Sequence, residues 1–163
     1  MTLAENIALP FQYHKDVPAD VADQKARALL ELMEMSALAD VTPSNAGISW
    51  VKRAALARAL ILEPDLLLLD NPSHGLNAHH VKWWRQFLDK LWHGHEWMDG
   101  KPVTIIVTTE DLRLWKNDTR RFALLRDKKF IPFNSWKDVA SQDDTIIMEL
   151  MEVSLDTIML RKD

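Results

Sequence analysis

The feature that most constrains the fold of this sequence is the alternation of helical segments with short apolar strands. Residues 66–69 are four consecutive leucines, and residues 103–109 read VTIIVTT, a run of β-branched side chains. Short, uninterrupted apolar runs are typical of strands that are buried on both faces. Each run follows a segment with helical spacing, so the sequence predicts a mainly parallel α/β sheet and argues against a helical bundle.

Helical periodicity predicts where the helices lie. We expect an amphipathic helix from about Asp20 to Leu38, then a loop with Pro43 and Asn45, and a second helix over 48–63 that ends before Pro64. A third helix is expected from residue 78 to near Gly94. The apolar face of the first helix is expected to carry Val21, Ala28, Leu29, Leu32 and Met35.

The last third of the chain predicts a hairpin and a helix. RFALLRD and KKFIPF read as two short strands joined around Asp127-Lys128, and residues 143–160 form a last amphipathic segment.

Composition excludes some classes of function. The formal net charge of −4 gives no electrostatic footprint for nucleic acid or an anionic membrane surface. No apolar run reaches the roughly 18 residues of a membrane span, no signal peptide is recognised, and there is no cysteine. We therefore expect a cytoplasmic protein without direct membrane insertion.

Glycine is scarce, and its positions bear on nucleotide binding. The four glycines are Gly47, Gly75, Gly94 and Gly100. Neither G-x-x-x-x-G-K-[ST] nor G-x-G-x-x-G occurs, although a loop that cradles phosphate needs clustered glycines so that its backbone N–H groups converge on the anion. These residues therefore lack the glycine-rich loop by which proteins most often bind a pyrophosphate.

The segment VKRAALARALILEPDLLLLDNPSHGLN resembles the ATPases of ABC transporters from the end of their signature motif through Walker B to the D-loop. It is similar in particular to the ATPase subunits of Mla-type phospholipid transporters. TLAENIALP resembles the segment after the Q-loop, VTIIVTTEDL the switch-histidine strand, and FALLRDKKFIPFNSWKDV the closing hairpin and helix. The resemblance implies a P-loop NTPase fold of ABC type, truncated at the N-terminus, because Walker A and the Q-loop glutamine would precede Met1.

The resemblance implies roles for individual residues, and several depart from the family pattern. Asp70 stands at the Walker B aspartate, which holds Mg²⁺, and would be a metal ligand only with bound Mg-nucleotide. Asn71 replaces the catalytic glutamate, and a neutral amide is no general base. The degenerate signature motif is Ala46, Gly47, Ile48, Ser49 and Trp50; Asn77 stands at the D-loop aspartate and Thr109 at the switch histidine.

Simpler interpretations stand beside these roles. Asp70 could be a strand-end carboxylate that caps the next turn, and Gly75 a turn glycine. The pairs His79-His80 and His93-x-His95 lack a matching cluster of metal ligands. We expect Lys52, Arg53 and Arg58 on a solvated helix face with local ion pairs, and Trp83, Trp84 and Trp92 packing the third helix on the sheet, part of the patch staying exposed.

The sequence as a whole predicts one partial ABC ATPase-like domain over residues 1–163. About 12–62 would form the helical subdomain and signature helix, and about 63–163 the Walker B core, hairpin and C-terminal helices. The predicted function is a degenerate, auxiliary subunit of a transport system, in particular lipid transport, that binds other proteins and does not hydrolyse ATP alone. The alternatives are the C-terminal part of a split or truncated ATPase that is active with its Walker A half, and a decayed gene product.

The resemblance also implies partners. We expect no cofactor for the isolated chain, and Mg-ATP if a Walker A half completes it. Partners would be a membrane permease, docking near residues 11–17 and the helix from Asp20, or another ATPase subunit, which would hold the protein peripherally at the inner membrane. In the family the Walker A strand lies between the strands resembling VTIIVTT and RFALLRD, so an open strand edge predicts self-association.

Overall fold

The computed structural model describes residues 1–117 and 121–152 and divides into two compact units, residues 1–108 and 109–163. Each unit is described by itself. The predicted subdomain division near residue 62 is a separate matter and stays a prediction.

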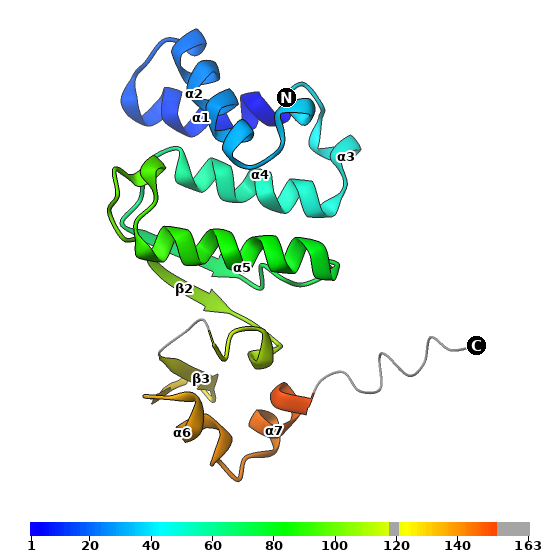
Figure 1. The fold of residues 1–163 in the computed structure, drawn as a ribbon, viewed down its shortest axis with the longest axis vertical. Helices are drawn as coiled ribbons and strands as arrows, with labels where there is room; N and C mark the ends of the chain where they lie inside the picture. The colour runs from blue at the N-terminus through cyan, green and yellow to red at the C-terminus, as the bar shows by residue number, and fades with distance from the viewer. Residues whose placement is uncertain (118–120, 153–163) are drawn as a thin grey trace, which may run out of the picture. The chain divides into compact units, whose positions relative to one another are not determined.

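The first unit begins with a layer of helices (Figure 1). It contains α1 (Leu3–Lys15), α2 (Ala19–Leu32), the 3₁₀ turn η1 (Ser36–Leu38), α3 (Pro43–Ala46) and α4 (Ile48–Leu60). Helix α1 was not predicted, although its start has a clear sequence signal: the Thr2 hydroxyl accepts from the Glu5 N–H, and the Glu5 carboxylate accepts from the Thr2 N–H. This reciprocal capping box satisfies two amide groups that the first helical turn leaves unpaired.

The predicted helix from Asp20 to Leu38 was too long. Helix α2 ends at Leu32 because Glu34 adopts a left-handed conformation with φ of 59°. The Met35 N–H then donates to the Leu30 carbonyl and the Glu34 N–H to the Glu31 carbonyl, which is the Schellman pattern of a helix end. The loop predicted around Pro43 and Asn45 is the single-turn helix α3.

The core of the helical layer consists of side chains that are at most 2% exposed, from α1, from α2 and α4, and from the residues that directly follow α2 and α4. The buried face of α2 is Ala22, Ala26, Leu29 and Leu30, whereas Val21 is 44% exposed. The predicted apolar face of this helix was therefore right at Leu29 and wrong at Val21. The other core side chains of the layer include Leu3, Ile7, Met33, Leu56, Leu60 and Ile61.

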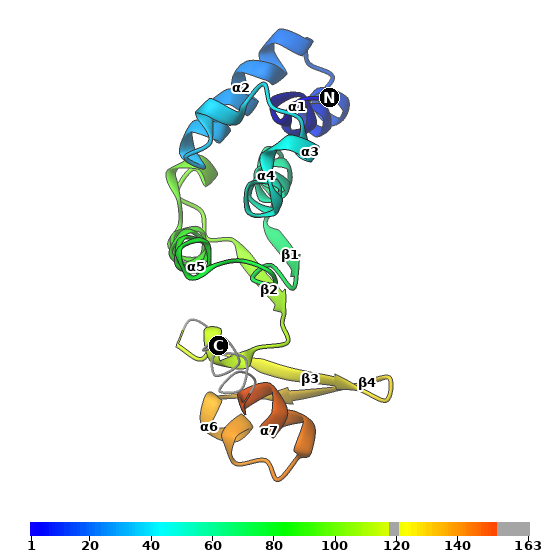
Figure 2. The ribbon, with the colours of Figure 1, turned by 90° about the vertical axis from the view of Figure 1, so that its right-hand side faces the viewer.

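The sheet of the first unit has two strands, β1 (Leu66–Asp70) and β2 (Thr104–Thr108), which run parallel. Helix α5 (Ala78–His93) and the 3₁₀ turn η2 (Glu96–Met98) connect them, and Figure 2 shows α5 along one side of the strands. The parallel pairing and the α5 segment were predicted correctly. Burial on both faces was not: Leu67 is 3% exposed, but Leu68 is 67% and Ile106 53% exposed, because α5 covers one face only.

The second unit contains η3 (Leu112–Leu114), the strands β3 (Phe122–Arg126) and β4 (Lys129–Phe133), and helices α6 (Trp136–Ala140) and α7 (Thr145–Glu152). The predicted hairpin is confirmed, with Asp127 and Lys128 both at positive φ in its turn. Its core is Phe122, Val139 and Ile147. The last predicted helix is confirmed as far as residue 152, and the rest of that prediction lies outside the described residues.

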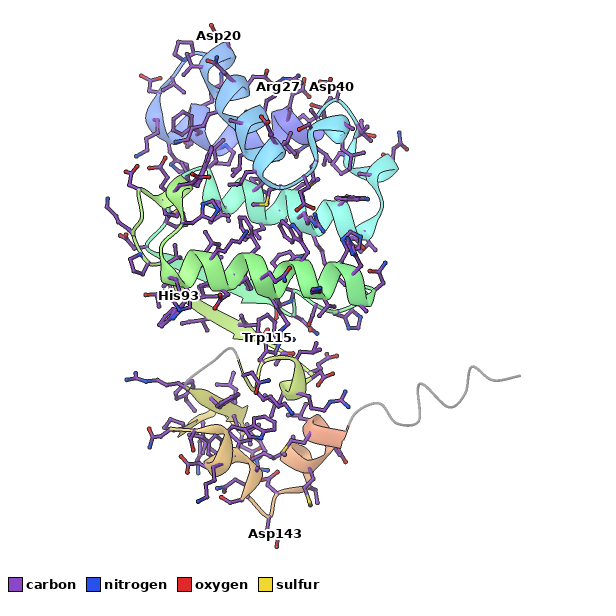
Figure 3. The ribbon with its side chains drawn as sticks, viewed as in Figure 1. Asp20, Arg27, Asp40, His93, Trp115 and Asp143 are labelled. Carbon is purple, nitrogen blue, oxygen red and sulfur yellow. The ribbon has the colours of Figure 1, made fainter. Side chains whose placement is uncertain are left out.

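Ion pairs fix the surface of the helical layer. Arg27 on α2 donates to Asp40 at 2.7 Å and to Asp23 at 2.7 Å, and Figure 3 shows Arg27 and Asp40 close together. The Arg27 guanidinium lowers the pKa of Asp40. The pair joins α2 to the segment that follows η1.

Candidate functional site

The candidate site lies at the carboxyl edge of the two parallel strands, where Asp70 and Thr108 are register partners. The Thr108 hydroxyl donates to Asp70 Oδ1 at 2.5 Å. The Asn71 N–H donates both to the Thr108 carbonyl and to the Thr108 hydroxyl, each at 3.1 Å. Asp70 is therefore held by the neighbouring strand, and no pattern in the sequence singles out Thr108.

Asn71 begins the loop that leaves this edge. Its φ of 44° lies in the left-handed region, which asparagine tolerates better than most residues. From α4, the Lys52 ammonium donates to the carbonyls of Asn71 (3.2 Å), Pro72 (3.3 Å) and His74 (2.6 Å). Lys52 is half-buried, and its ammonium binds these loop carbonyls in place of the local ion pairs that were predicted.

Asn77 ends this loop and caps α5. Its side-chain oxygen accepts from the His80 N–H at 3.1 Å, which satisfies one free amide of the first helical turn. Gly75 has a φ of 72°, as expected of a turn glycine. The assignment of Asn77 to the D-loop position stays a prediction.

The predicted signature residues surround the start of α4. Ala46 is buried, and Gly47 is the residue before the helix, with φ of 79° and ψ of 152°. Ile48 is 60% exposed and Ser49 half-buried. The Trp50 ring meets the His80 ring edge to face, with centroids 5.1 Å apart. Trp50 thus packs against α5, and the degeneracy of the motif stays a prediction.

Arg53, one turn further along α4, is wholly buried, which corrects the prediction of a solvated residue. Its guanidinium carbon lies 3.8 Å from the Trp83 ring centroid and 4.8 Å from that of Trp50. Nη1 donates to the Met33 carbonyl at 3.2 Å and to Glu34 at 3.4 Å. Cation–π stacking and these bonds replace the water that the charge loses.

His80 completes this cluster. Its Nδ1 lies 3.2 Å from Arg53 Nη2. Since a guanidinium only donates, Nδ1 accepts and the proton of the neutral ring sits on Nε2. Burial lowers the pKa of His80, and the charges of Arg53 and His79 lower it further.

Thr109 is the first residue of the second unit. Its hydroxyl accepts from the Asp111 N–H at 3.1 Å and donates to the Asp111 carbonyl at 3.2 Å. Asp111 pairs with Arg113 at 2.7 Å, and this contact lowers the pKa of the Asp111 carboxyl. Thr109 serves a local turn, and its assignment to the switch-histidine position stays a prediction.

The histidine pairs are not gathered into a metal site in the part of the chain that the structure describes. The His80 ring faces Arg53. The Nδ1 atom of His93 lies 2.9 Å from the Asp89 carbonyl oxygen. The Nδ1 atom of His95 accepts a hydrogen bond from the Trp97 N–H at 3.0 Å. Each ring has a local structural partner.

A hollow of about 230 Å³ lies beside Asp70, between α4 and β1. Its wall is mainly apolar and includes Lys52, Ala55, Leu68, Pro72 and Trp84. Ligand pockets usually measure about 300–1,000 Å³, so this hollow is smaller than a typical small-molecule site. Separately, none of the described helices is long and apolar enough to cross a bilayer.

Comparisons with known proteins find similar sequences among ATP-binding proteins of ABC transporters. The chain is 33% identical over 113 residues to a putative ABC transporter ATP-binding protein of Methanosarcina acetivorans, covering 69% of this chain and 17% of that protein. It is 25% identical over 152 residues to the intermembrane phospholipid transport system ATP-binding protein MlaF of Escherichia coli, covering 93% of this chain and 54% of that protein. No protein-family model matches.

A solved structure agrees. A dimeric ATP-binding cassette in a post-hydrolysis state with ADP and Pi superposes with a TM-score of 0.67 at 27% identity, over 82% of this chain and 56% of that one. Fold and relatives together define a P-loop NTPase fold of ABC type. The chain is similar to the ATP-binding proteins of ABC transporters and spans only part of their length, about half in the case of MlaF.

Proposed function

We propose that this chain is an auxiliary, ABC ATPase-like component of a transport system that acts by binding other proteins and does not hydrolyse ATP by itself. The observation that carries the proposal is the residue after Asp70. Asn71 offers a neutral amide where hydrolysis would need a base, and its backbone is fixed by Thr108 and Lys52.

The neighbouring side chains support the same proposal. Trp50 is packed on His80, Asn77 caps α5, and one oxygen of Asp70 accepts from Thr108. Mg²⁺ demands octahedral oxygen coordination and usually binds through one or two carboxylates plus phosphate oxygens. Asp70 alone fits an ion that nucleotide would bring, and does not fit a site built by protein alone.

Titration with Mg-ATP tests the proposal. We expect no saturable binding tighter than about 100 μM, a threshold equal to roughly 5.5 kcal/mol. Asn71→Glu is expected to give no phosphate release, because a restored base has no phosphate held in front of it. Turnover by this single variant would contradict the proposal, and Asn77→Asp is the matched control, an amide-to-acid change at the end of the same loop.

Retention of Asp70 at the strand end favours one second candidate, the C-terminal part of a split ATPase. Under it, adding a polypeptide with a Walker A strand and loop would restore nucleotide binding, and with Asn71→Glu some turnover. Binding without such an addition would contradict both candidates.

The proposed partner is a membrane permease, and the proposed system is lipid transport of the Mla kind, supported by the match to MlaF over 93% of this chain. The proposed docking surface is residues 11–17 with the start of α2, which would hold the chain peripherally at the inner membrane. If hydrogen exchange of this segment is unchanged on mixing with a cognate permease, the docking proposal is wrong.

A further inference from the structure

A hollow of about 460 Å³ lies between the end of α2 and the turn η2, within the first unit, and forms the α2–η2 groove. Figure 2 shows the end of α2 next to η2, the green turn between α5 and β2. The volume falls within the roughly 300–1,000 Å³ of typical ligand pockets. Because η2 precedes β2 in the chain, the groove lies at the amino edge of the sheet, opposite the edge of the candidate site.

Helix α2 forms one wall of the groove. Ala28, Glu31 and Leu32 line it, and they share one helix face because they are three and four positions apart. Ala28 is exposed and carries only a methyl group, so it leaves room in front of the helix, while Leu32 is half-buried and adds apolar surface.

The opposite wall is Trp97 of η2, whose ring is held in place. The indole Nε1 donates to the Leu60 carbonyl at 3.1 Å, and the Trp97 N–H donates to His95 Nδ1 at 3.0 Å. Both polar groups of this residue that can donate are therefore used inside the protein. The half-buried ring is oriented before any ligand arrives.

Two carboxylates, Glu31 from α2 and Glu96 from η2, give the groove its charge. Both are exposed, and within the residues that the structure describes neither has an ion-pair partner. Lys25 is the cation nearest to Trp97, with Nζ 5.6 Å from the ring centroid, and it already pairs with Glu63 at 2.5 Å. The groove thus has two uncompensated negative charges, and its complement is a cation.

The first unit already contains the contact that such a groove could make. The guanidinium carbon of Arg53 lies 3.8 Å from the Trp83 ring centroid, and Nη1 donates to Glu34 at 3.4 Å. A guanidinium stacks on an indole with its flat face and donates hydrogen bonds in its plane, which a compact ammonium cannot do. An aromatic wall with carboxylates beside it therefore suits arginine better than lysine.

We propose that the α2–η2 groove is a docking site for an arginine side chain on the surface of a partner protein. The guanidinium lies on the ring of Trp97 and donates to Glu31 and Glu96. This inference rests on the proposed function, in which the chain acts by binding other proteins, and it adds a surface separate from residues 11–17. The formal net charge of −4 also favours a basic partner.

Titration followed by the NMR signal of the Trp97 indole N–H tests the groove. The chain has seven tryptophans, and Trp97→Phe identifies the signal. Nα-acetyl-arginine amide is expected to shift it saturably, with half-saturation on the order of 10 mM. Nα-acetyl-citrulline amide has the same shape without the charge, and at matched ionic strength it should bind at least about tenfold more weakly. Equal shifts with both compounds, or no saturable shift with the arginine amide, would overturn the proposal.

Variants of the lining assign the binding to the groove. Glu31→Gln combined with Glu96→Gln removes the charges at equal volume and should raise the Kd for the arginine amide at least about tenfold. Ala28→Leu fills the groove with a good helix former and should abolish the shift. Asp20→Asn, a loss of charge at the other end of α2, is the matched control and should leave the Kd within about twofold. Unchanged affinity in the groove variants, or the same loss in the control, counts against the docking site.

Free arginine distinguishes a docking site from a site for the amino acid. A side chain on a partner has no free α-carboxylate, and the α-carboxylate of free arginine is repelled by the two glutamates, so it should bind no more tightly than the amide. Tighter binding of free arginine by about tenfold would contradict docking. No nucleotide is present: turnover of Mg-ATP by a chain that binds the arginine amide would strike the proposed function alone, and failure of the titration would strike the groove alone.

Discussion

The helical layer of the first unit and its two-stranded sheet both contain leucines, yet only the helical layer buries them completely. Leu29 and Leu30 of α2 are fully buried, whereas Leu66 and Leu68 of β1 are 48% and 67% exposed. Helices satisfy their backbone bonds internally and need only one another to bury a face. Strands need neighbours for bonds as well as for burial, and a two-stranded sheet is incomplete by both measures.

The largest expected effect contrasts the two regions with the same substitution. Leu29→Ala should lower the free energy of unfolding by about 2–5 kcal/mol, because it leaves a cavity in a closed core. Leu68→Ala should change it by less than about 0.5 kcal/mol, since the side chain is already exposed. Urea unfolding followed by circular dichroism measures both. Equal losses would mean that the bare face is covered in solution.

A smaller effect is expected at Arg53, where α4 meets α5. Arg53→Ala removes the stacking on Trp83 and Trp50 and opens a cavity, so we expect a loss of about 2–4 kcal/mol. Arg53→Met keeps the volume without the charge and should cost less than about 1.5 kcal/mol. If both variants lose the same amount in urea unfolding, charge outweighs packing at this position.

The smallest effect is the pH dependence of the same contact. The folded state lowers the pKa of His80 below the usual 6.5, so the unfolded chain binds the proton more readily. The contribution of neutral His80 to the free energy of unfolding is complete above about pH 6.5 and is lost as the pH falls through the folded pKa. The free energy of unfolding then changes by at most about 1.4 kcal/mol per pH unit.

Melting temperatures at pH 7.5 and 5.5 measure this effect. His80→Gln is expected to reduce the difference most, and His79→Gln to reduce it by less, because the charge of His79 is the smallest of the causes that lower the pKa of His80. The groups facing His80 are Arg53, Trp50 and His79, and the Asp40 and Asp111 carboxyls titrate below this window because their pKa values are lowered. If the difference in melting temperature persists in His80→Gln, another titratable group causes it.

Much of the fold could be predicted because local signals suffice for it. The parallel pairing of β1 and β2, the extent of α5 and the hairpin at Asp127-Lys128 follow from periodicity and turn chemistry. The end of α2 was missed because Glu34 takes the position where glycine usually marks a helix end. Helix α1 was missed although its capping box is visible at Thr2 and Glu5, because Pro10 lies within the helix.

The sequence predicted which residues belong to the candidate site, but it did not predict which side chains contact them. Asp70, Asn71 and Asn77 were singled out from the sequence, and the structure gathers them at one strand edge and the loop that leaves it. Their partners Thr108 and Lys52 come from segments 37 and 19 residues away from Asn71, and no local pattern marks such a pair.

By itself, the sequence determined which segments are helix or strand, and it placed the carboxylate of Asp70 at a strand end next to a neutral amide, because periodicity and residue type are local properties. Only the tertiary structure decided that Lys52 and Arg53, adjacent cations on one helix, have different roles. Lys52 binds loop carbonyls, and Arg53 is buried between two indole rings. The tertiary structure also decided which face of the sheet is bare. Burial depends on what packs opposite a residue, and that partner comes from elsewhere in the chain or from another molecule.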